Sequence, residues 1–171
     1  MLMHSKNSIV KAAFFLVVGL LFSSFKFSDW EFDKKYTAKI QKSISELFNS
    51  NSYNFEELKE FEEAFYAIKE ADFVLGYFVV AKALSKFHEF DYYIIFDKKE
   101  MILKVEVLQY RENYGAEICN KRWLKKFINT STSNFAQYNR KIDGISGATI
   151  SVNSIKKDVF LLSNMLKEKI K

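Results

Sequence analysis

Two runs of strand-forming residues, separated by only four positions, constrain the fold of this chain most strongly. The first run, 92–96, reads YYIIF, and the second, 101–110, reads MILKVEVLQY. The residues between them, DKKE at 97–100, are polar and suit a tight turn. Such a short connection joins antiparallel neighbours, because parallel neighbours need a crossover of a dozen or more residues. The sequence therefore predicts an antiparallel hairpin over 92–110.

The second run also predicts which side chains are buried. Leu103, Val105 and Val107 alternate with Lys104 and Glu106, and a period of two residues is typical of a strand with one buried face. We expect the three apolar side chains to face the core and the two charged side chains to face solvent.

The rest of the chain predicts further strands and flanking helices. Residues 64–82 favour another hairpin around Glu70–Asp72, although the apolar spacing over 55–70 also fits a helix. Amphipathic patterns predict helices over 31–48, over 120–129, and from about Val152 to the end. These elements indicate an α+β fold, an antiparallel sheet of hairpins flanked by helices in a single domain.

The N-terminus resembles an export signal or a membrane anchor. Lys6 and Lys11 precede an apolar run of eleven residues, Ala12–Phe22, and two serines come after it. A basic start, a short apolar run and small residues are the parts of a secretory signal. A membrane helix needs about 20 apolar residues, so this run is short. No clear cleavage site comes after it, and both a cleaved signal and an uncleaved anchor stay open.

Charge and histidine content argue against several functions. The formal net charge is +5, but the lysines sit beside glutamates for most of the chain and form no basic face. Nucleic-acid binding uses a concentrated basic patch, so we expect no nucleic-acid partner. Beyond the first 25 residues His88 is the only histidine. This argues against a zinc site or a Ser–His triad, and we expect no metal.

A loop of small and hydroxylated residues precedes the last predicted helix. Residues 143–151 read DGISGATIS. A helix N-terminus attracts phosphate through its unpaired N–H groups and its partial positive charge. Gly144 and Gly147 would let the backbone approach a ligand, and Ser151 suits the N-cap position. The residues indicate a phosphate site, and an ordinary loop with a serine cap fits them equally well.

The motif SGAT at 146–149, with Asp143 three residues before it, resembles the flavinylation motif of the FMN-binding domain family. This family includes the C subunit of the sodium-translocating NADH:quinone reductase and the G subunit of the Rnf complex. In those proteins a flavin transferase joins FMN to the threonine by a phosphoester bond. The resemblance therefore implies FMN on Thr149. The candidate cofactor-binding residues of the loop are Asp143, Gly144, Ser146, Gly147, Ala148, Thr149 and Ile150.

A second stretch carries the same resemblance. Residues 105–127 resemble the family's strand, its glutamate-containing turn with a glycine, and its short helix ending in phenylalanine. Glu112, Gly115 and Trp123 fall at the matching positions, whereas the pair Tyr114-Gly115 replaces a commoner run of small residues. The resemblance covers roughly residues 64–165.

Three residues of this stretch are further candidates to contact the flavin. Trp123 could stack on the isoalloxazine ring, or it could pack in the core. The same two interpretations apply to Tyr114. Glu112 could bond the flavin or its ribityl chain, or it could be a solvated or turn-capping carboxylate.

These features predict an extracytoplasmic flavoprotein of electron transfer. Its partners would be a flavin transferase for maturation, a membrane-side electron donor and an extracytoplasmic acceptor. The flavin would supply the chemistry, and we assign no catalytic residue. We expect a signal or anchor over 1–25, a helical lead-in over 26–63 and the FMN-binding domain over 64–171. Two alternatives stay open: non-covalent FMN binding, and a secreted structural or interaction module with a coincidental SGAT loop.

The export signal can be tested with a reporter that is active only outside the cytoplasm, fused after Lys171. We expect it to be active, because Lys6 and Lys11 favour a cytoplasmic N-terminus and export of the residues beyond the apolar run. A second fusion carries a reporter that is active only in the cytoplasm. If the second reporter works and the first does not, the chain stays inside.

Overall fold

The computed structural model of this chain describes residues 34–59, 61 and 63–170. The strands are β1 (Asn54–Glu57), β2 (Phe65–Glu70), β3 (Phe73–Leu84), β4 (Glu89–Asp97) and β5 (Ile102–Gln109). The helices are α2 (Lys34–Phe48), α3 (Lys121–Leu124), α4 (Phe135–Asn139) and α5 (Thr149–Lys169), with short 3-10 helices η1 (Ala116–Cys119) and η2 (Lys125–Phe127).

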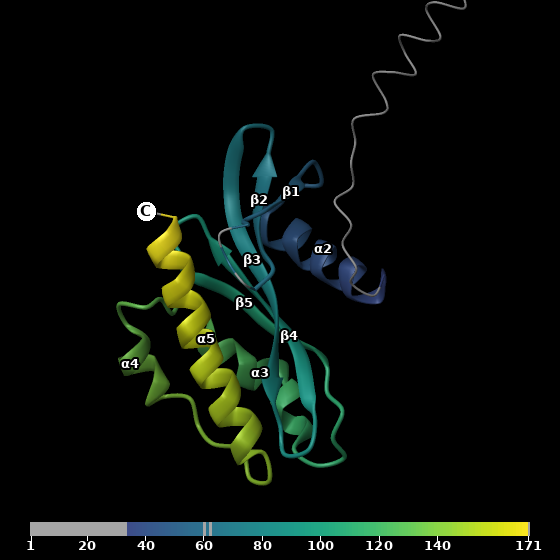
Figure 1. Cartoon of the computed structure of the whole chain (residues 1–171), viewed down its shortest axis with the longest axis vertical. Coiled ribbons are helices and arrows are strands. Elements are labelled where there is room, and N and C mark those ends of the chain that lie inside the picture. Colours follow the sequence, from purple (N-terminus) through teal and green to yellow (C-terminus); the bar gives the residue numbers. More distant parts are fainter. Residues whose placement is uncertain (1–33, 60, 62, 171) are drawn as a thin grey trace, which may run out of the picture. The chain divides into compact units, whose positions relative to one another are not determined.

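The five strands form one antiparallel sheet in the order β1-β2-β3-β4-β5 (Figure 1). Each strand pairs with its neighbour in sequence, because short turns connect consecutive strands. The hairpins predicted over 64–82 and 92–110 are confirmed as β2–β3 and β4–β5. Over 55–70 the strand interpretation holds, since β1 and β2 occupy the two ends of this stretch. The predicted α+β fold is confirmed.

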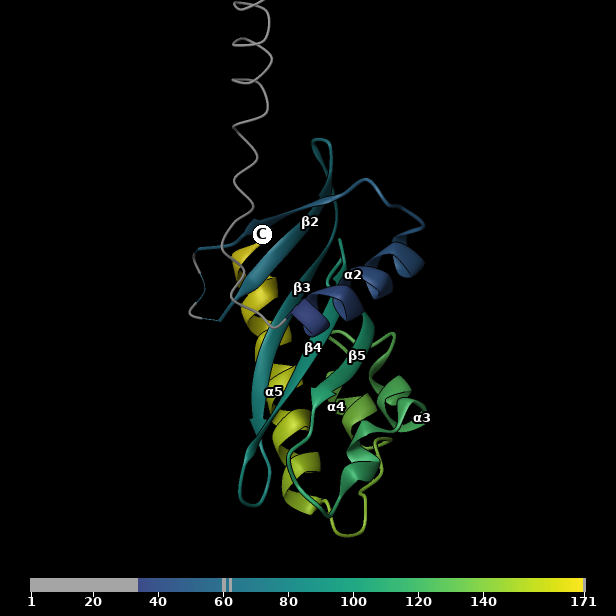
Figure 2. The same ribbon diagram turned by 90° about the vertical axis from the view of Figure 1, so that its right-hand side faces the viewer.

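One face of the sheet packs against α5 and the short helices (Figure 2). Alternate residues of β4 point to this side because strand side chains alternate. They are Phe90, Tyr92, Ile94 and Phe96, all fully buried. From α5 they meet Ile155, Val159, Leu162 and Leu166, which recur at helical spacing. This cluster is the main hydrophobic core.

The other face of the sheet packs against α2 (Figure 2). Ile40 and Ile44 of the helix are fully buried. A Cβ atom on Gly76 of β3 would lie 2.7 Å from the ring of Phe48 and 2.3 Å from the Phe96 carbonyl oxygen. The absence of a side chain at Gly76 therefore lets the end of α2 approach the sheet.

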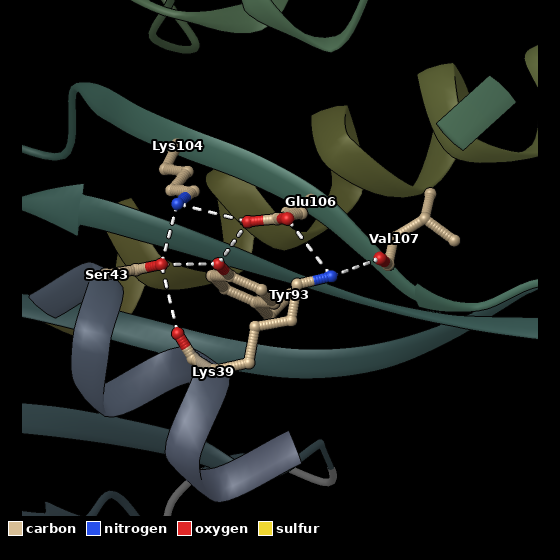
Figure 3. A network of polar contacts seen from close by, with 6 residues as sticks. All are labelled: Lys39, Ser43, Tyr93, Lys104, Glu106 and Val107. Atoms are coloured by element: carbon tan, nitrogen blue, oxygen red, sulfur yellow. Dashed lines mark hydrogen bonds and ion pairs between the residues drawn. The ribbon is translucent and has the colours of Figure 1, made fainter. Parts of the chain in front are cut away.

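A buried carboxylate links α2 to this second face (Figure 3). Glu106 of β5 forms ion pairs with Lys39 of α2 at 3.0 Å and with Lys104 at 3.1 Å. It also accepts a hydrogen bond from the Tyr93 hydroxyl at 2.7 Å. Burial alone would raise the pKa of Glu106, but the hydrogen bonds from Tyr93, Lys39 and Lys104 outweigh it and lower the pKa to about 2.

Two further contacts complete this polar cluster (Figure 3). The Ser43 hydroxyl lies 2.8 Å from the Tyr93 hydroxyl and accepts from the Lys104 ammonium at 2.6 Å. Lys39 donates to the Val107 carbonyl oxygen at 3.0 Å. The cluster therefore satisfies the buried charge and fixes α2 over β4 and β5.

The structure corrects the predicted orientation of β5. Glu106 is only 6% exposed, and Lys104 points to the same cluster. Contrary to the prediction, neither side chain faces open solvent. The reason is that α2 covers this face, which the alternation within one strand does not reveal. Val105 and Val107 do belong to the main core, but Leu103 does not. The register shifts at Leu103, and Ile102 takes its place in the core.

The predicted signal or anchor over 1–25 lies outside the described residues. Within the part of the chain that the structure describes, no helix is both long and apolar enough to cross a membrane. The segment predicted as a helical lead-in, 26–63, contains α2 and also β1.

The Glu106 cluster predicts an acid-sensitive component of stability. Because the folded pKa of Glu106 lies below its ordinary value of 4.5, this stabilisation is present above about pH 4.5 and is lost as the pH falls towards 2. Glu106→Gln should lower the free energy of unfolding by about 2 kcal/mol at pH 7, and the variant should lose less stability below pH 4.5. Urea unfolding at several pH values measures this.

The matched control is Glu168→Gln, at an exposed position of α5. It should change the free energy of unfolding by less than about 0.5 kcal/mol. Equal effects of the two substitutions would show that the cluster does not hold α2 in place.

Candidate functional site

Three loops meet at the end of the sheet where α5 begins (Figures 1 and 2). They are the β3–β4 turn at 85–88, the segment 110–115 after β5, and the loop 140–148 before α5. The SGAT motif comprises the last three residues of the third loop and the first residue of α5. Hydrogen bonds and close packing connect each loop to the next. The motif is therefore held in place by the other two loops.

The SGAT motif forms a tight turn that ends in the helix. The Ala148 N–H donates to the Ile145 carbonyl oxygen at 3.0 Å, which closes a four-residue turn. Gly147, the third residue of this turn, has a φ of 81°, a conformation that favours glycine. A Cβ atom on Gly144 or Gly147 would meet no other atom within 4 Å. The backbone of this loop is therefore open to an approaching ligand.

Helix α5 begins at Thr149, three residues earlier than the sequence predicts. Ala148 is the N-cap and no side chain caps this end of the helix. Ser151, expected as the N-cap, lies in the first turn and is 2% exposed. Thr149 and Ile150 are exposed. An uncapped helix N-terminus with an exposed hydroxyl presents N–H groups and a partial positive charge to an anion.

Gly115 explains why Ala148 can occupy the N-cap position. A Cβ atom on Gly115 would lie 2.9 Å from the Cβ atom of Ala148, and the φ of Gly115 is 77°. Ala148 is 3% exposed. The Tyr110 hydroxyl donates to the Tyr114 carbonyl oxygen and lies 3.1 Å from the Ser151 hydroxyl. The loop 110–115 is therefore fastened to the first turn of α5.

Asp143 is fixed by the short helices that follow β5. Its carboxylate pairs with Lys126, and its carbonyl oxygen accepts from the Trp123 indole N–H at 2.9 Å. The hydrogen bond and charge of Lys126 lower the pKa of Asp143. The carboxylate is nevertheless 72% exposed, so it is charged at neutral pH and accessible to another protein.

Trp123 packs in the core and also hydrogen-bonds to the loop before α5 through Asp143. It is 8% exposed and packs edge-to-face on Phe127, with ring centroids 5.5 Å apart. It also lines an open hollow of about 410 Å³ beside the SGAT turn, here called the Trp123 hollow. The lining residues are Glu117, Asn120, Arg122, Trp123, Lys126 and Ile145. Most of the Trp123 ring is thus used in the core, and the remainder borders this hollow.

Glu112 holds the β3–β4 turn against the segment 110–115. Its Oε1 accepts from the Ser85 hydroxyl at 2.5 Å and from the Phe87 and His88 N–H groups at 2.6 and 3.0 Å. The hydrogen bond from Ser85 and, to a smaller extent, the one from Phe87 lower the pKa of Glu112. In this structure the carboxylate therefore caps a turn. Tyr114 is 83% exposed and leaves its ring available to a ligand or partner.

The structure adds two residues that sequence reasoning missed. Tyr110 is the last residue of the predicted strand, and nothing in that pattern indicates that its hydroxyl reaches Ser151. Lys126 pairs with Asp143 across 17 positions, and a lysine in a short helix gives no signal of this pairing. Both residues position the motif and do not belong to it.

The contact between Gly115 and Ala148 predicts that Gly115→Ala is destabilising. The new methyl group would clash with Ala148 and would require a strained φ. We expect a loss of about 2 kcal/mol in the free energy of unfolding by urea denaturation. Gly144→Ala, where the Cβ meets nothing, is the control and should cost less than about 1 kcal/mol. Equal losses would argue against this close contact.

Comparison with known proteins identifies the domain around this site. The model of the FMN-binding domain family matches residues 88–160, from the β3–β4 turn to the middle of α5. The match includes Glu112, Gly115, Trp123 and the entire SGAT loop. A search of curated proteins finds no match. Residues 88–160 are therefore an FMN-binding domain, and FMN is the cofactor that this family indicates.

Proposed function

We propose that this protein carries FMN as a phosphoester on Thr149 and acts in electron transfer outside the cytoplasm. The observation that carries the proposal is the position of Thr149. It is exposed at the uncapped start of α5, inside the region matched to the FMN-binding domain family. Asp143 and the residues Ser146–Ala148 precede it in the sequence, as in the flavinylation motif.

The residues present fit the phosphate end of FMN. The N–H groups at the start of α5 are not capped by a side chain, and the turn carries glycines with open space where a Cβ atom would be. These groups would hold the phosphate at the helix N-terminus. Thr149 would provide the covalent attachment, and the bound flavin would supply the redox chemistry.

The attachment step is a phosphoryl transfer. The Thr149 oxygen forms a bond to the phosphorus of an activated flavin nucleotide that the transferase supplies. The bond between that phosphorus and its leaving group breaks, and the threonine proton departs. The protein gains the mass of FMN less one water. Thr149 acts once, during maturation, so it is an attachment residue and not a catalytic one.

The exposed carboxylate of Asp143 supports recognition by a transferase. Lys126 pairs with the carboxylate, and the Trp123 indole N–H bonds the Asp143 carbonyl oxygen, so both the side chain and the backbone of Asp143 are held in position. A second protein can therefore contact it together with Thr149. Covalent attachment would also benefit an exported protein, since the flavin is then retained independently of binding affinity.

An electron carrier needs a flavin that partners can approach. Four exposed apolar side chains lie on or beside the three loops around Thr149: Leu84, Phe87, Tyr114 and Ile150. Phe87 is 74% exposed and Tyr114 is 83% exposed, which is uncommon for aromatic side chains. Such a surface supports close approach of a redox partner. The N-terminal apolar run of the sequence supports a location outside the cytoplasm or at the membrane.

The attachment predicts a specific pattern of labelling by a flavin transferase. The unmodified chain should gain the mass of FMN less one water, and Thr149→Ala should gain nothing, because it lacks the reacting oxygen. Thr149→Ser should retain partial labelling. Ser146→Ala, which removes a neighbouring hydroxyl of the same turn, is the matched control and should still be labelled. Intact mass spectrometry measures each variant.

Two other results would point elsewhere. Undiminished labelling of Thr149→Ala would place the flavin on a different residue. Bound flavin that is lost completely on denaturation of the transferase-treated chain would favour the non-covalent alternative.

A further inference from the structure

The backbone of Tyr114 is held close to the proposed attachment residue. Its carbonyl oxygen accepts a hydrogen bond from the Tyr110 hydroxyl at 3.1 Å. The next residue, Gly115, lies against Ala148, because a Cβ atom on Gly115 would be 2.9 Å from the Cβ atom of Ala148. Thr149 comes directly after Ala148. The fold therefore anchors Tyr114 near the start of α5.

These contacts use the backbone of Tyr114 and leave its side chain 83% exposed. So large an exposed fraction is uncommon for an aromatic residue. Small residues are commoner in this stretch of the FMN-binding domain family, so the fold of such a domain does not need an aromatic ring here. The exposed ring of Tyr114 is thus a feature of this chain that packing does not explain.

A phosphoester on Thr149 would fix only one end of FMN. A flexible ribityl chain separates the phosphate from the isoalloxazine ring, so the ring needs a second contact to acquire a defined position. Flat apolar rings pack well on aromatic and apolar walls. Near the SGAT motif, Tyr114 and the Trp123 hollow are the two candidates for such a wall.

The Trp123 hollow offers less aromatic surface than Tyr114 does. Trp123 is only 8% exposed and packs on Phe127, and its indole N–H donates to the Asp143 carbonyl oxygen. Four of the six lining residues are polar or charged: Glu117, Asn120, Arg122 and Lys126. Tyr114, whose ring is exposed, is therefore the better wall for a flavin ring.

We propose that Tyr114 packs on one face of the isoalloxazine ring of FMN attached to Thr149. This inference rests on the proposed function for the presence of the flavin. The ring contact gives the flavin a defined position beside the first turn of α5. The opposite face of the flavin ring stays open to a redox partner. Tyr114 takes no part in forming the phosphoester.

Contact with a tyrosine has a measurable optical consequence. An excited flavin accepts an electron from an adjacent phenol ring and then returns it, with no net reaction, so the fluorescence of the flavin is quenched. A phenylalanine packs in the same way but does not donate this electron. Fluorescence yield therefore reports contact with the tyrosine, whereas time-resolved anisotropy reports whether the flavin ring rotates with the protein.

The test uses the full chain after treatment with the flavin transferase, and intact mass confirms one FMN per chain. The unmodified chain should be dimmer than free FMN, and its flavin should rotate with the whole protein. Tyr114→Ala should be about three-fold brighter or more and should show fast rotation of the ring, because the stacked arrangement is lost. Tyr114→Phe should also be brighter, but its flavin should rotate slowly, since an aromatic wall is still present.

Two control substitutions remove exposed side chains elsewhere. Phe73→Ala removes a ring that is 76% exposed at the start of β3. This is the opposite end of that 12-residue strand from the β3–β4 turn (Figure 1). Arg122→Ala removes an exposed lining residue of the Trp123 hollow. Both controls should match the unmodified chain in brightness and in rotation.

Three results would overturn the proposal. The first is unchanged brightness and rotation in Tyr114→Ala. The second is equally fast rotation in Tyr114→Phe and Tyr114→Ala. The third is release of the ring by Arg122→Ala but not by Tyr114→Ala, which would place the flavin ring in the Trp123 hollow.

Failure of the ring contact is distinct from failure of the proposed function. All four variants should gain the mass of FMN less one water as the unmodified chain does, because each keeps the SGAT motif and Asp143. If no chain acquires covalent flavin, the proposed function fails and the ring contact fails with it. If the chains are labelled and Tyr114→Ala behaves like the unmodified chain, only the ring contact fails.

Discussion

Gly115 lies directly against Ala148, and the geometry of the proposed flavin site depends on this contact. Gly115 has no side chain and Ala148 has only a methyl group. The segment after β5 can therefore approach the first turn of α5 closely enough for Tyr110 to reach Ser151. Ala148 can then serve as a buried N-cap that leaves the helix end uncapped by any side chain. The result is an exposed Thr149 at a helix end that no side chain caps, which is an arrangement that favours phosphate binding.

The two faces of the sheet differ in what packs against them. The face towards α5 carries the main apolar core and, at its end, the proposed flavin site. The opposite face is covered by α2 and is fixed by the buried charge of Glu106. The hydrogen bonds and ion pairs of the Glu106 cluster join α2 to β4 and β5.

The sequence predicted most of the elements, because strand alternation and short turns are local signals. The hairpins β2–β3 and β4–β5 and the order of the helices follow from such patterns. The buried environment of Glu106 does not follow from such local patterns, because a helix about 60 positions away in the sequence covers it. The site shows the same division. The motif around Thr149 is visible in sequence, whereas the start of α5, the pairing of Asp143 with Lys126 and the turn-capping contacts of Glu112 depend on tertiary contacts.

The most direct test of the central claim is a tryptic map of the transferase-treated, unmodified protein after denaturation. Cleavage after Lys141 and Lys156 releases one peptide, residues 142–156, that contains the entire SGAT motif and Thr149. A phosphoester on Thr149 predicts that flavin fluorescence elutes with this peptide, and that its fragment masses locate the added FMN on Thr149. Fluorescence on any other peptide, or no covalently bound flavin at all, would contradict the claim.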